Sequence, residues 1–276
     1  MKDAITFIEP QSEILAGKIK LYYFHSSSDQ NYKNEITYYP NYTSTLNVYQ
    51  HSSVQWSKYE RTHSYQESAK PLILLAGKIN KSRKITLQGL LNKITIVFNP
   101  LGLNHFVETP LSSLIAEHFS FFDYFGSDFE EVIYEVFETS NIEQKRDLLD
   151  NFFLSHLRPF TEHRLKNVII DILKADEPIK ISNLAQIHGI HRRTLLRLFQ
   201  KHLAYSMEEF LSVVKFRKAM IQHQSHEYSL TRLALEANYY DQSHFIKNCT
   251  LKCGESPKTL FSQLKVLEKG LFWKLK

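Results

Sequence analysis

The sequence has 276 residues, of which 43% are hydrophobic and 23% charged, which is typical of a folded protein of one or two domains and excludes a disordered chain. The formal net charge of +5 is uneven, because residues 161–276 hold 19 Lys+Arg and 11 Asp+Glu, a net +8, which leaves −3 for residues 1–160. This asymmetry suggests that one domain meets a polyanion and the other does not. The two cysteines are too few for a disulfide framework, and we see neither a secretory leader nor the ~18 apolar residues that cross a bilayer. The sequence therefore predicts a cytoplasmic protein without membrane contact.

The first part of the chain, up to about residue 107, is predicted to be a β-sandwich or small barrel. Its short apolar or alternating runs are bounded by Ser, Asn, Gly or Pro, as strands are. The expected strands are residues 18–24, 43–49, 71–77, 84–88 and 93–98. This part is the core of an expected N-terminal sensor or dimerisation domain, residues 1–159.

Residues 110–158 have a helical pattern. Ser127 with Glu130 and Ser140 with Glu143 have the spacing of capping boxes, in which a serine and a glutamate satisfy free backbone donors at a helix start. They predict helices over 128–138 and 141–157. Arg158-Pro159 ends the second helix, and we expect the domain boundary there.

An all-α C-terminal domain, residues 160–276, is predicted next, beginning with an amphipathic helix over 163–175 and remaining helical to its end. Residues 181–202 then have the pattern of a helix-turn-helix unit. Such a unit needs a small residue where its helices cross, a turn residue that accepts positive φ, and apolar residues that hold the second helix. Ala185 fits the crossing and Gly189 the turn, and the apolar residues are Leu184, Ile190, Leu195 and Leu198. The second helix carries Arg192, Arg193 and Arg197, and arginine can bind guanine through two hydrogen bonds or hold phosphates.

A second helix-turn-helix unit is predicted at about residues 229–252. Ala234 takes the crossing, Asn238 takes the turn because asparagine also accepts the left-handed region, and Asp241 can cap the second helix. The apolar anchors Phe245 and Cys249 stand one residue later than in the first unit, so the second turn should be one residue longer. Between the units, a capping box from Ser206 to Glu209 starts a linker helix over 207–221. It is apolar on more than one side, as a helix buried between two partners is.

This layout resembles the DNA-binding domain of the AraC/XylS family of bacterial regulators. The resemblance covers about residues 161–264. The family patterns Gly-Phe-x-Asp-x-Ser-x-Phe and Gly-x-Ser-Pro correspond to Asn238-Tyr-Tyr-Asp-Gln-Ser-His-Phe245 and Gly254-Glu-Ser-Pro257, and the linker pattern Arg-hydrophobic-x-x-Ala to Lys215-Phe-Arg-Lys-Ala219. Asn238, Cys249 and Ala204 depart from the common glycine, phenylalanine and glycine of the family. The residues before it resemble, more loosely, the uncharacterised β-rich N-terminal domains of some members.

The resemblance implies a sequence-specific transcription regulator that binds double-stranded promoter or operator DNA. The family's base-reading positions fall on Arg193, Leu196 and Arg197, and on Gln242, Ser243, Ile246 and Lys247, with Arg192 as a further DNA contact. Leu196 and Ile246 cannot form hydrogen bonds, so they can only touch thymine methyl groups. The second helix-turn-helix unit is expected to read fewer bases and to hold mainly the DNA backbone. Further expected partners are a small-molecule effector for the N-terminal domain, a second copy of the chain through the N-terminal half, and RNA polymerase if the protein is an activator.

Several residues have two interpretations. Cys249 and Cys253 could pair or bind a metal, but a small residue in a phenylalanine position is favoured, and we expect no metal site. The five N-terminal histidines, His25, His51, His63, His105 and His118, lack the spacing of a metal site and should be exposed or hydrogen-bonded. His191 is either a phosphate contact or a surface histidine. Aromatic residues of the N-terminal domain could line an effector pocket or simply fill the core: Tyr22, Tyr23, Phe24, Tyr38, Tyr39, Tyr49 and Trp56.

Two other functions compete with the regulator. In one, the N-terminal domain is catalytic and the basic domain tethers it to DNA; no nucleophile with a base, phosphate loop or metal spacing supports an enzyme, and we expect no cofactor. The family also includes DNA-repair methyltransferases, but the N-terminal half here has no cysteine. In the other, the protein is an architectural DNA binder that binds promoter and random duplexes equally well.

Overall fold

The computed structural model describes residues 4–57, 60–68, 70–115, 118–225, 228–266 and 272–275. The chain forms two compact units. The first comprises residues 1–35, 43–77 and 85–161, and the second comprises 36–42, 78–84 and 162–276. The principal division, after residue 161, lies close to the helix end that the sequence indicates at Arg158-Pro159. No pattern of the sequence indicates that the short segments 36–42 and 78–84 belong to the second unit.

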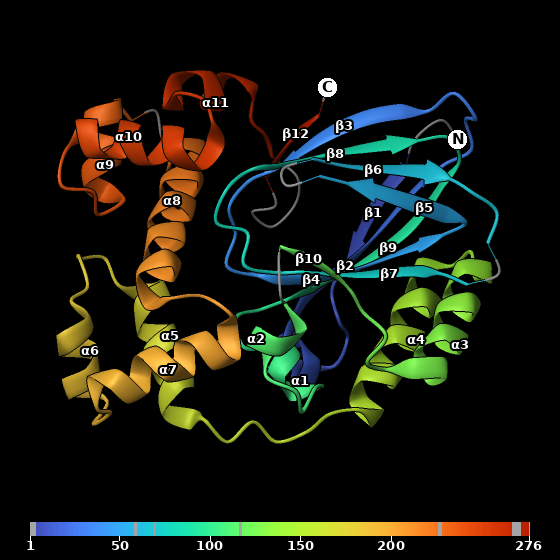
Figure 1. The fold of residues 1–276 in the computed structure, drawn as a ribbon, viewed down its shortest axis with the longest axis horizontal. Helices are drawn as coiled ribbons and strands as arrows, with labels where there is room; N and C mark the ends of the chain where they lie inside the picture. Colours follow the sequence, from blue (N-terminus) through green and yellow to red (C-terminus); the bar gives the residue numbers. More distant parts are fainter. Residues whose placement is uncertain are drawn as a thin grey trace. The chain divides into compact units, whose positions relative to one another are not determined.

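The first unit is rich in antiparallel strands (Figure 1). One sheet has the order β1-β2-β9-β4-β7-β10. A second sheet has the order β11-β12-β3-β8-β6-β5, in which β11 (Lys265–Val266) and β12 (Phe272–Leu275) come from the second unit. The five predicted strands correspond to β2, β4, β7, β8 and β9, and the β-rich character of this half is confirmed. The strands of the first half are β1 (Ala4–Ile8), β2 (Ile19–Ser27), β3 (Lys33–Tyr38), β4 (Ser44–Gln50), β5 (Ser52–Trp56), β6 (Glu60–Tyr65), β7 (Leu72–Ala76), β8 (Arg83–Gln88), β9 (Leu91–Phe98) and β10 (Phe119–Phe121).

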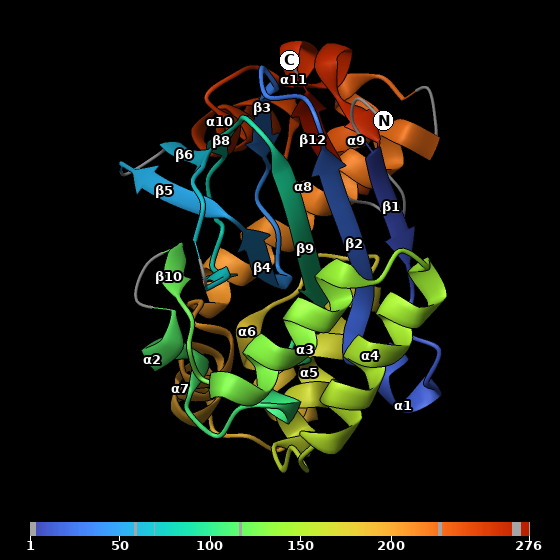
Figure 2. The same cartoon turned by 90° about the vertical axis from the view of Figure 1, so that its right-hand side faces the viewer.

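Two helices, α3 (Gly126–Glu138) and α4 (Ile142–Ser155), lie side by side in the first unit (Figure 2). Their apolar faces are buried, and the ring of Phe153 lies 5.7 Å from that of Phe98 on β9. The buried carboxylate of Asp150 on α4 accepts a hydrogen bond of 2.7 Å from the hydroxyl of Tyr22 on β2. Three short helical turns complete the unit: α1 (Glu13–Ala16), η1 (Leu103–His105) and α2 (Leu111–Leu114).

The predicted capping boxes of α3 and α4 are wrong. Helix α3 begins at Gly126, one residue before Ser127, so the serine lies inside the first turn and cannot cap it. Helix α4 is capped by Asn141, whose side chain accepts a hydrogen bond of 2.9 Å from the backbone N–H of Gln144. Asparagine caps a helix as well as serine does. Because Ser140 and Asn141 are neighbours, the sequence pattern could not show which of them is the cap.

Helices form most of the second unit, and α8 (Met207–Ser225) is the longest of those described. In Figure 1, α5, α6 and α7 lie around one end of α8, and α9, α10 and α11 lie around the other. The helices other than α8 are α5 (His163–Lys174), α6 (Ile181–Ile187), α7 (Arg192–Leu203), α9 (Leu230–Glu236), α10 (Gln242–Cys253) and α11 (Pro257–Gln263). The predicted helical C-terminal domain with a linker helix is confirmed.

The chain does not remain helical to its end, which corrects one prediction. After α11 come two short strands, β11 (Lys265–Val266) and β12 (Phe272–Leu275). Strand β12 pairs antiparallel with residues 36–38 of β3. Strands this short carry no periodic signal, and the partner lies more than 230 residues earlier in the sequence, so the pattern of residues could not indicate the pairing.

Helix α7 ends at an unusual residue, because Ala204 adopts a left-handed conformation with φ of 58°. A residue with a Cβ is strained there, whereas glycine is not. We predict that Ala204→Gly raises the free energy of unfolding by about 0.5–1 kcal/mol, the relief of strain being partly offset by the freer unfolded chain. Urea unfolding measures the change. Ala219→Gly inside α8 is the control and should be destabilising; a loss of stability in both variants would contradict the prediction.

Candidate nucleic-acid interface

The first helix-turn-helix unit is built from α6 and α7 as the sequence predicts. Ala185 is buried at the crossing, and Gly189 has φ of 58° in the turn. The backbone N–H of Ile190 donates to the carbonyl of Ala185 at 2.9 Å, which closes the turn. Leu184, Ile190, Leu195, Leu198 and Phe199 are all buried. This packing leaves the other side of α7 free to face solvent.

The second helix-turn-helix unit repeats this construction in α9 and α10. Ala234 is fully buried, Asn238 has φ of 65°, and the N–H of Tyr239 donates to the carbonyl of Ala234 at 2.9 Å, as Ile190 does to Ala185. Five residues, 237–241, separate the helices here, against four, 188–191, in the first unit. The predicted longer turn is thus present. Asp241 caps α10 by accepting from the N–H of His244 at 2.7 Å.

The expected base-reading residues lie on the outer sides of the two recognition helices. On α7, Arg192, Arg193 and Arg197 are exposed and Leu196 is half-buried. On α10, Ser243 and Lys247 are exposed, whereas Gln242 and Ile246 are half-buried. At the expected base-reading positions and Arg192, the first helix therefore offers three exposed cations and the second offers one, so α7 presents more positive charge than α10 at these positions.

Sequence reasoning missed one partner of this surface. The hydroxyl of Thr231 on α9 donates to the side-chain carbonyl of Gln242 at 2.7 Å. The amide NH₂ of Gln242 is then the group left to face a ligand, and it can donate to acceptors on base edges. Thr231 stands eleven residues earlier, outside any spacing pattern of the recognition helix.

Helix α8 joins the two units and is buried on more than one side. Its buried residues are Met207, Phe210, Val213, Val214, Phe216, Arg217, Ala219 and Met220. The predicted capping box is present, because Ser206 Oγ accepts from the N–H of Glu209 at 3.1 Å and Glu209 Oε2 accepts from the N–H of Ser206 at 3.0 Å. Burial lowers the pKa of the Arg217 guanidinium to about 10, although Tyr42 acts in the opposite direction. Arg217 therefore faces the interior, so not every basic residue of the linker can meet DNA.

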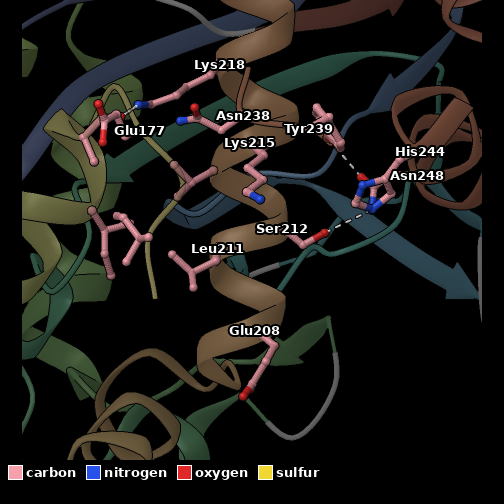
Figure 3. Close-up of a pocket in the computed structure, with 14 residues that line it drawn as sticks. Glu177, Glu208, Leu211, Ser212, Lys215, Lys218, Asn238, Tyr239, His244 and Asn248 are labelled. Carbon is pink, nitrogen blue, oxygen red and sulfur yellow. Dashed lines mark hydrogen bonds between the residues drawn. The ribbon is translucent and has the colours of Figure 1, made fainter. Parts of the chain in front are cut away.

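A cavity of about 260 Å³ lies beside α8, between the end of α5 and the start of α10 (Figure 3). Lys215 and Lys218 of α8 line the cavity together with Asn238, His244 and Asn248 of the second helix-turn-helix unit. Burial lowers the pKa of both lysines, and for Lys218 the nearby Asp176 acts against that shift. The ammonium of Lys218 donates to the carbonyl of Ala175, and Asn248 bridges Tyr239 and Ser212. These contacts tie α8 to the end of α5 and to the second helix-turn-helix unit.

The residues with two interpretations divide as follows. Cys249 is buried in the apolar core beside Phe245, and both cysteines are free thiols. His191 is exposed at the start of α7 and makes no side-chain cap there. In the described part of the chain, no group of three or more His, Cys, Asp or Glu is arranged to hold a metal ion, and no helix is both long and apolar enough to span a membrane.

His63 departs from the expectation that the N-terminal histidines are exposed or hydrogen-bonded. It is buried and stacks on Tyr49 with ring centroids 3.9 Å apart, and within the described residues neither ring nitrogen has a hydrogen-bond partner. Burial, reinforced by Arg61 and Lys93, lowers its pKa. Tyr22, Tyr23 and Tyr49 are also buried, whereas Trp56 is half-exposed.

Comparison with known proteins concerns mainly the second unit. Residues 184–263 match a family model described as a helix-turn-helix domain. An uncharacterized HTH-type transcriptional regulator of Haemophilus influenzae is 30% identical over 87 residues, which are 31% of this chain and 29% of that protein. The chain therefore matches less than a third of this curated relative's length.

Two solved structures are similar at lower levels. A transcriptional regulator with an AraC-type DNA-binding domain from Chromobacterium violaceum is 19% identical and covers 37% of this chain and 92% of its own, with a TM-score of 0.35. ToxT from Vibrio cholerae is 11% identical and covers 95% of this chain and 97% of its own, with a TM-score of 0.40. Scores of this size do not establish a shared fold.

The cap of the second recognition helix can be tested directly. We predict that Asp241→Ala lowers the free energy of unfolding by about 1 kcal/mol, because the N–H of His244 loses its acceptor. Asp241→Asn should retain most of the stability, since asparagine caps equally well. Thermal unfolding followed by circular dichroism measures both. Equal stabilities of Asp241→Ala and Asp241→Asn would show that the side chain does not cap α10.

Proposed function

From the AraC-type helix-turn-helix domain at residues 184–263, we propose that this chain is a sequence-specific, DNA-binding transcription regulator. The observation that carries the proposal is the repetition of one construction. Two helix-turn-helix units, each with a buried alanine at the crossing and a left-handed turn residue, pack against one buried helix, α8. Each unit presents the outer side of its second helix to solvent: the basic α7 in the first unit and α10, capped by Asp241, in the second.

In the proposed complex, α7 and α10 enter two adjacent segments of the major groove. Arg193 and Arg197, one turn apart on α7, bind base edges or phosphates, and Arg192 at the helix start binds phosphate. Gln242 and Lys247 contact the second segment, with Ser243 beside them. Leu196 and Ile246 can only make apolar contacts, and both are half-buried, so they contribute shape more than sequence reading.

The first unit is assigned the regulatory role, binding a small-molecule effector or a second copy of the chain. Several large apolar side chains of α3 and α4, among them Phe129, Ile133, Phe152 and Phe153, are buried within this unit. Tyr134 and Leu154 remain partly exposed on α3 and α4, and a homodimer would use this side. A cavity of about 430 Å³ between β7 and α3, lined by Phe121, Phe122, Phe125 and Phe129, is a candidate effector site. The regulator would act in the cytoplasm, with RNA polymerase as its partner if it activates.

The arginines of α7 test the function. We predict that Arg193→Ala and Arg197→Ala each weaken binding to a selected operator by about 1–3 kcal/mol and relax the preference at one or two base pairs. Arg197→Lys should lose most of the preference, because an ammonium cannot make the two-pronged contact with guanine. Fluorescence anisotropy on the operator and on variants with single base changes measures these effects.

The matched control is Lys201→Ala, which removes an exposed positive charge from the opposite end of α7. It should leave the base preference unchanged. If Arg193→Ala and Arg197→Ala weaken binding equally for every sequence and lower the salt dependence by about one counterion, they contact phosphates alone. Equal wild-type affinity for operator and random duplexes would instead identify a non-specific architectural binder and refute the proposal.

The spacing of the two recognition helices gives a second test. A single chain should protect two major-groove segments about one duplex turn, ~34 Å, apart on one face of the DNA, because α8 holds both units. Hydroxyl-radical footprinting resolves the two segments. A footprint confined to one major-groove segment would contradict simultaneous reading by α7 and α10.

A further inference from the structure

Two segments of the first half of the sequence belong structurally to the helix-turn-helix unit. Residues 36–42 and 78–84 are each flanked on both sides by residues of the first unit, yet they pack within the second. The segments are joined to each other by a bridge in which the N–H of Asn41 donates to the carbonyl of Ile79 at 3.0 Å. We call these two bridged segments, which include the end of β3 and the start of β8, the clamp.

The clamp supplies part of the core of the second helix-turn-helix. The side chain of Tyr39 is only 3% exposed and packs in one apolar cluster with residues of α8, α9, α10 and α11. Its hydroxyl donates to Glu255 Oε1 at 3.2 Å, immediately after α10. The neighbours of Tyr39 in this cluster include Phe216, Met220, Leu233, Ala234, Phe245 and Leu260. The alanine crossing and the anchor of the recognition helix thus share a core with a residue from the first half of the chain.

The clamp also makes polar contacts at the start of α8 and at the end of α10. Asn80 Nδ2 donates to Glu209 Oε1 at 2.9 Å, so the carboxylate that caps α8 also binds the clamp. The hydroxyl of Tyr205, in the turn between α7 and α8, donates to the carbonyl of Asn41 at 2.7 Å. The N–H of Ser82 donates to the carbonyl of Lys252 at 2.7 Å, one of the carbonyls at the end of α10 that no helical N–H reaches.

We propose that Tyr39, Asn41 and Asn80 are positioning residues for DNA reading, and that the clamp is the route by which the first unit controls the second recognition helix. The inference rests on the proposed function. An ordered clamp completes the core under α10 and fixes the start of α8, which favours binding. A change in the first unit that withdraws Tyr39 opens that core and releases α10. Leu195, Leu198 and Phe199, which hold α7, do not belong to that cluster. The clamp reaches the α7 side separately, because the ring of Tyr42 lies 6.0 Å from that of Phe210, which in turn lies 5.6 Å from that of Phe199. Regulation through Tyr39 therefore acts on the half of the operator that α10 reads.

The test uses the full chain and a duplex selected in vitro by the wild-type protein, with two derivatives in which either the α7 half or the α10 half is scrambled. Tyr39→Ala opens the shared core. Tyr39→Phe keeps the ring and should restore binding. Asn80→Ala combined with Tyr205→Phe removes two polar contacts of the clamp without opening a cavity. Tyr22→Phe is the matched control, since it deletes a buried, hydrogen-bonded tyrosine hydroxyl in the first unit, outside the clamp.

We expect Tyr39→Ala to bind the selected duplex about tenfold more weakly and to lose discrimination against the scrambled α10 half only. The Asn80→Ala/Tyr205→Phe variant breaks contacts at the start of α8, so it should weaken binding to a smaller extent without confining the loss to the α10 half. Tyr22→Phe should retain both discriminations. Unchanged discrimination in Tyr39→Ala would overturn the proposal. Equal loss at both halves would also overturn it, because the clamp would then support the fold in general.

Hydrogen exchange on the DNA-free protein separates this inference from the proposed function. In the DNA-free protein, the amides of α9 and α10 should exchange faster in Tyr39→Ala, with those of α6 and α7 unchanged, and this result does not depend on whether the protein can bind DNA. If the wild-type protein selects no duplex but the exchange pattern is as expected, the DNA-binding function fails and the clamp stands. If α6, α7, α9 and α10 all exchange as in the wild type, the clamp fails.

Discussion

The burial of α8 is the constraint on which the helix-turn-helix unit depends. The helix has 19 residues, about 28 Å at 1.5 Å per residue, and its buried side chains contact α5 and α7 near one end and α9 at the other. One packed helix, rather than a flexible linker, therefore holds both recognition helices in position. A helix packed on more than one side cannot rotate without breaking several contacts at once. In the proposed complex, this fixes the distance between the two DNA segments that a single chain can read.

The start of α8 is in contact with a segment from the first half of the sequence. The carboxylate of Glu209 accepts from the backbone of Ser206 with one oxygen and from Asn80 with the other. One side chain thus satisfies a free donor of the helix and binds a segment located 129 residues earlier in the sequence. Tyr39 makes the corresponding connection through apolar contact at the opposite end of the unit. In the inferred regulation, these two connections transmit the state of the first unit without any change in the recognition helices themselves.

The positive charge of the C-terminal part is less uniform than its total suggests. Arg192, Arg193 and Arg197 are exposed on α7, whereas Arg217 and Lys252 are buried and Lys215 and Lys218 of α8 are half-buried. Burial lowers the pKa of the Lys215, Lys218 and Lys252 ammonium groups, since water no longer stabilises their charge. The net charge of +8 predicts a polyanion partner, but the burial pattern decides that, of the two recognition helices, α7 presents more exposed cations than α10. The two recognition helices are consequently unequal partners in the proposed binding.

The sequence by itself determined both helix-turn-helix units, because a crossing alanine, a turn residue and apolar anchors are local requirements with fixed spacing. It also determined the caps Ser206 and Asp241, the extra turn residue before α10 and five of the strands. Only the tertiary structure decided that Tyr39 and Asn80 belong to the helical unit, that Thr231 orients Gln242, and that His63 is buried with its ring on Tyr49. These contacts join residues that are distant along the chain or that lie on different elements. Local periodicity records which side of a helix or strand is apolar, and it holds no information about which distant segment covers that side.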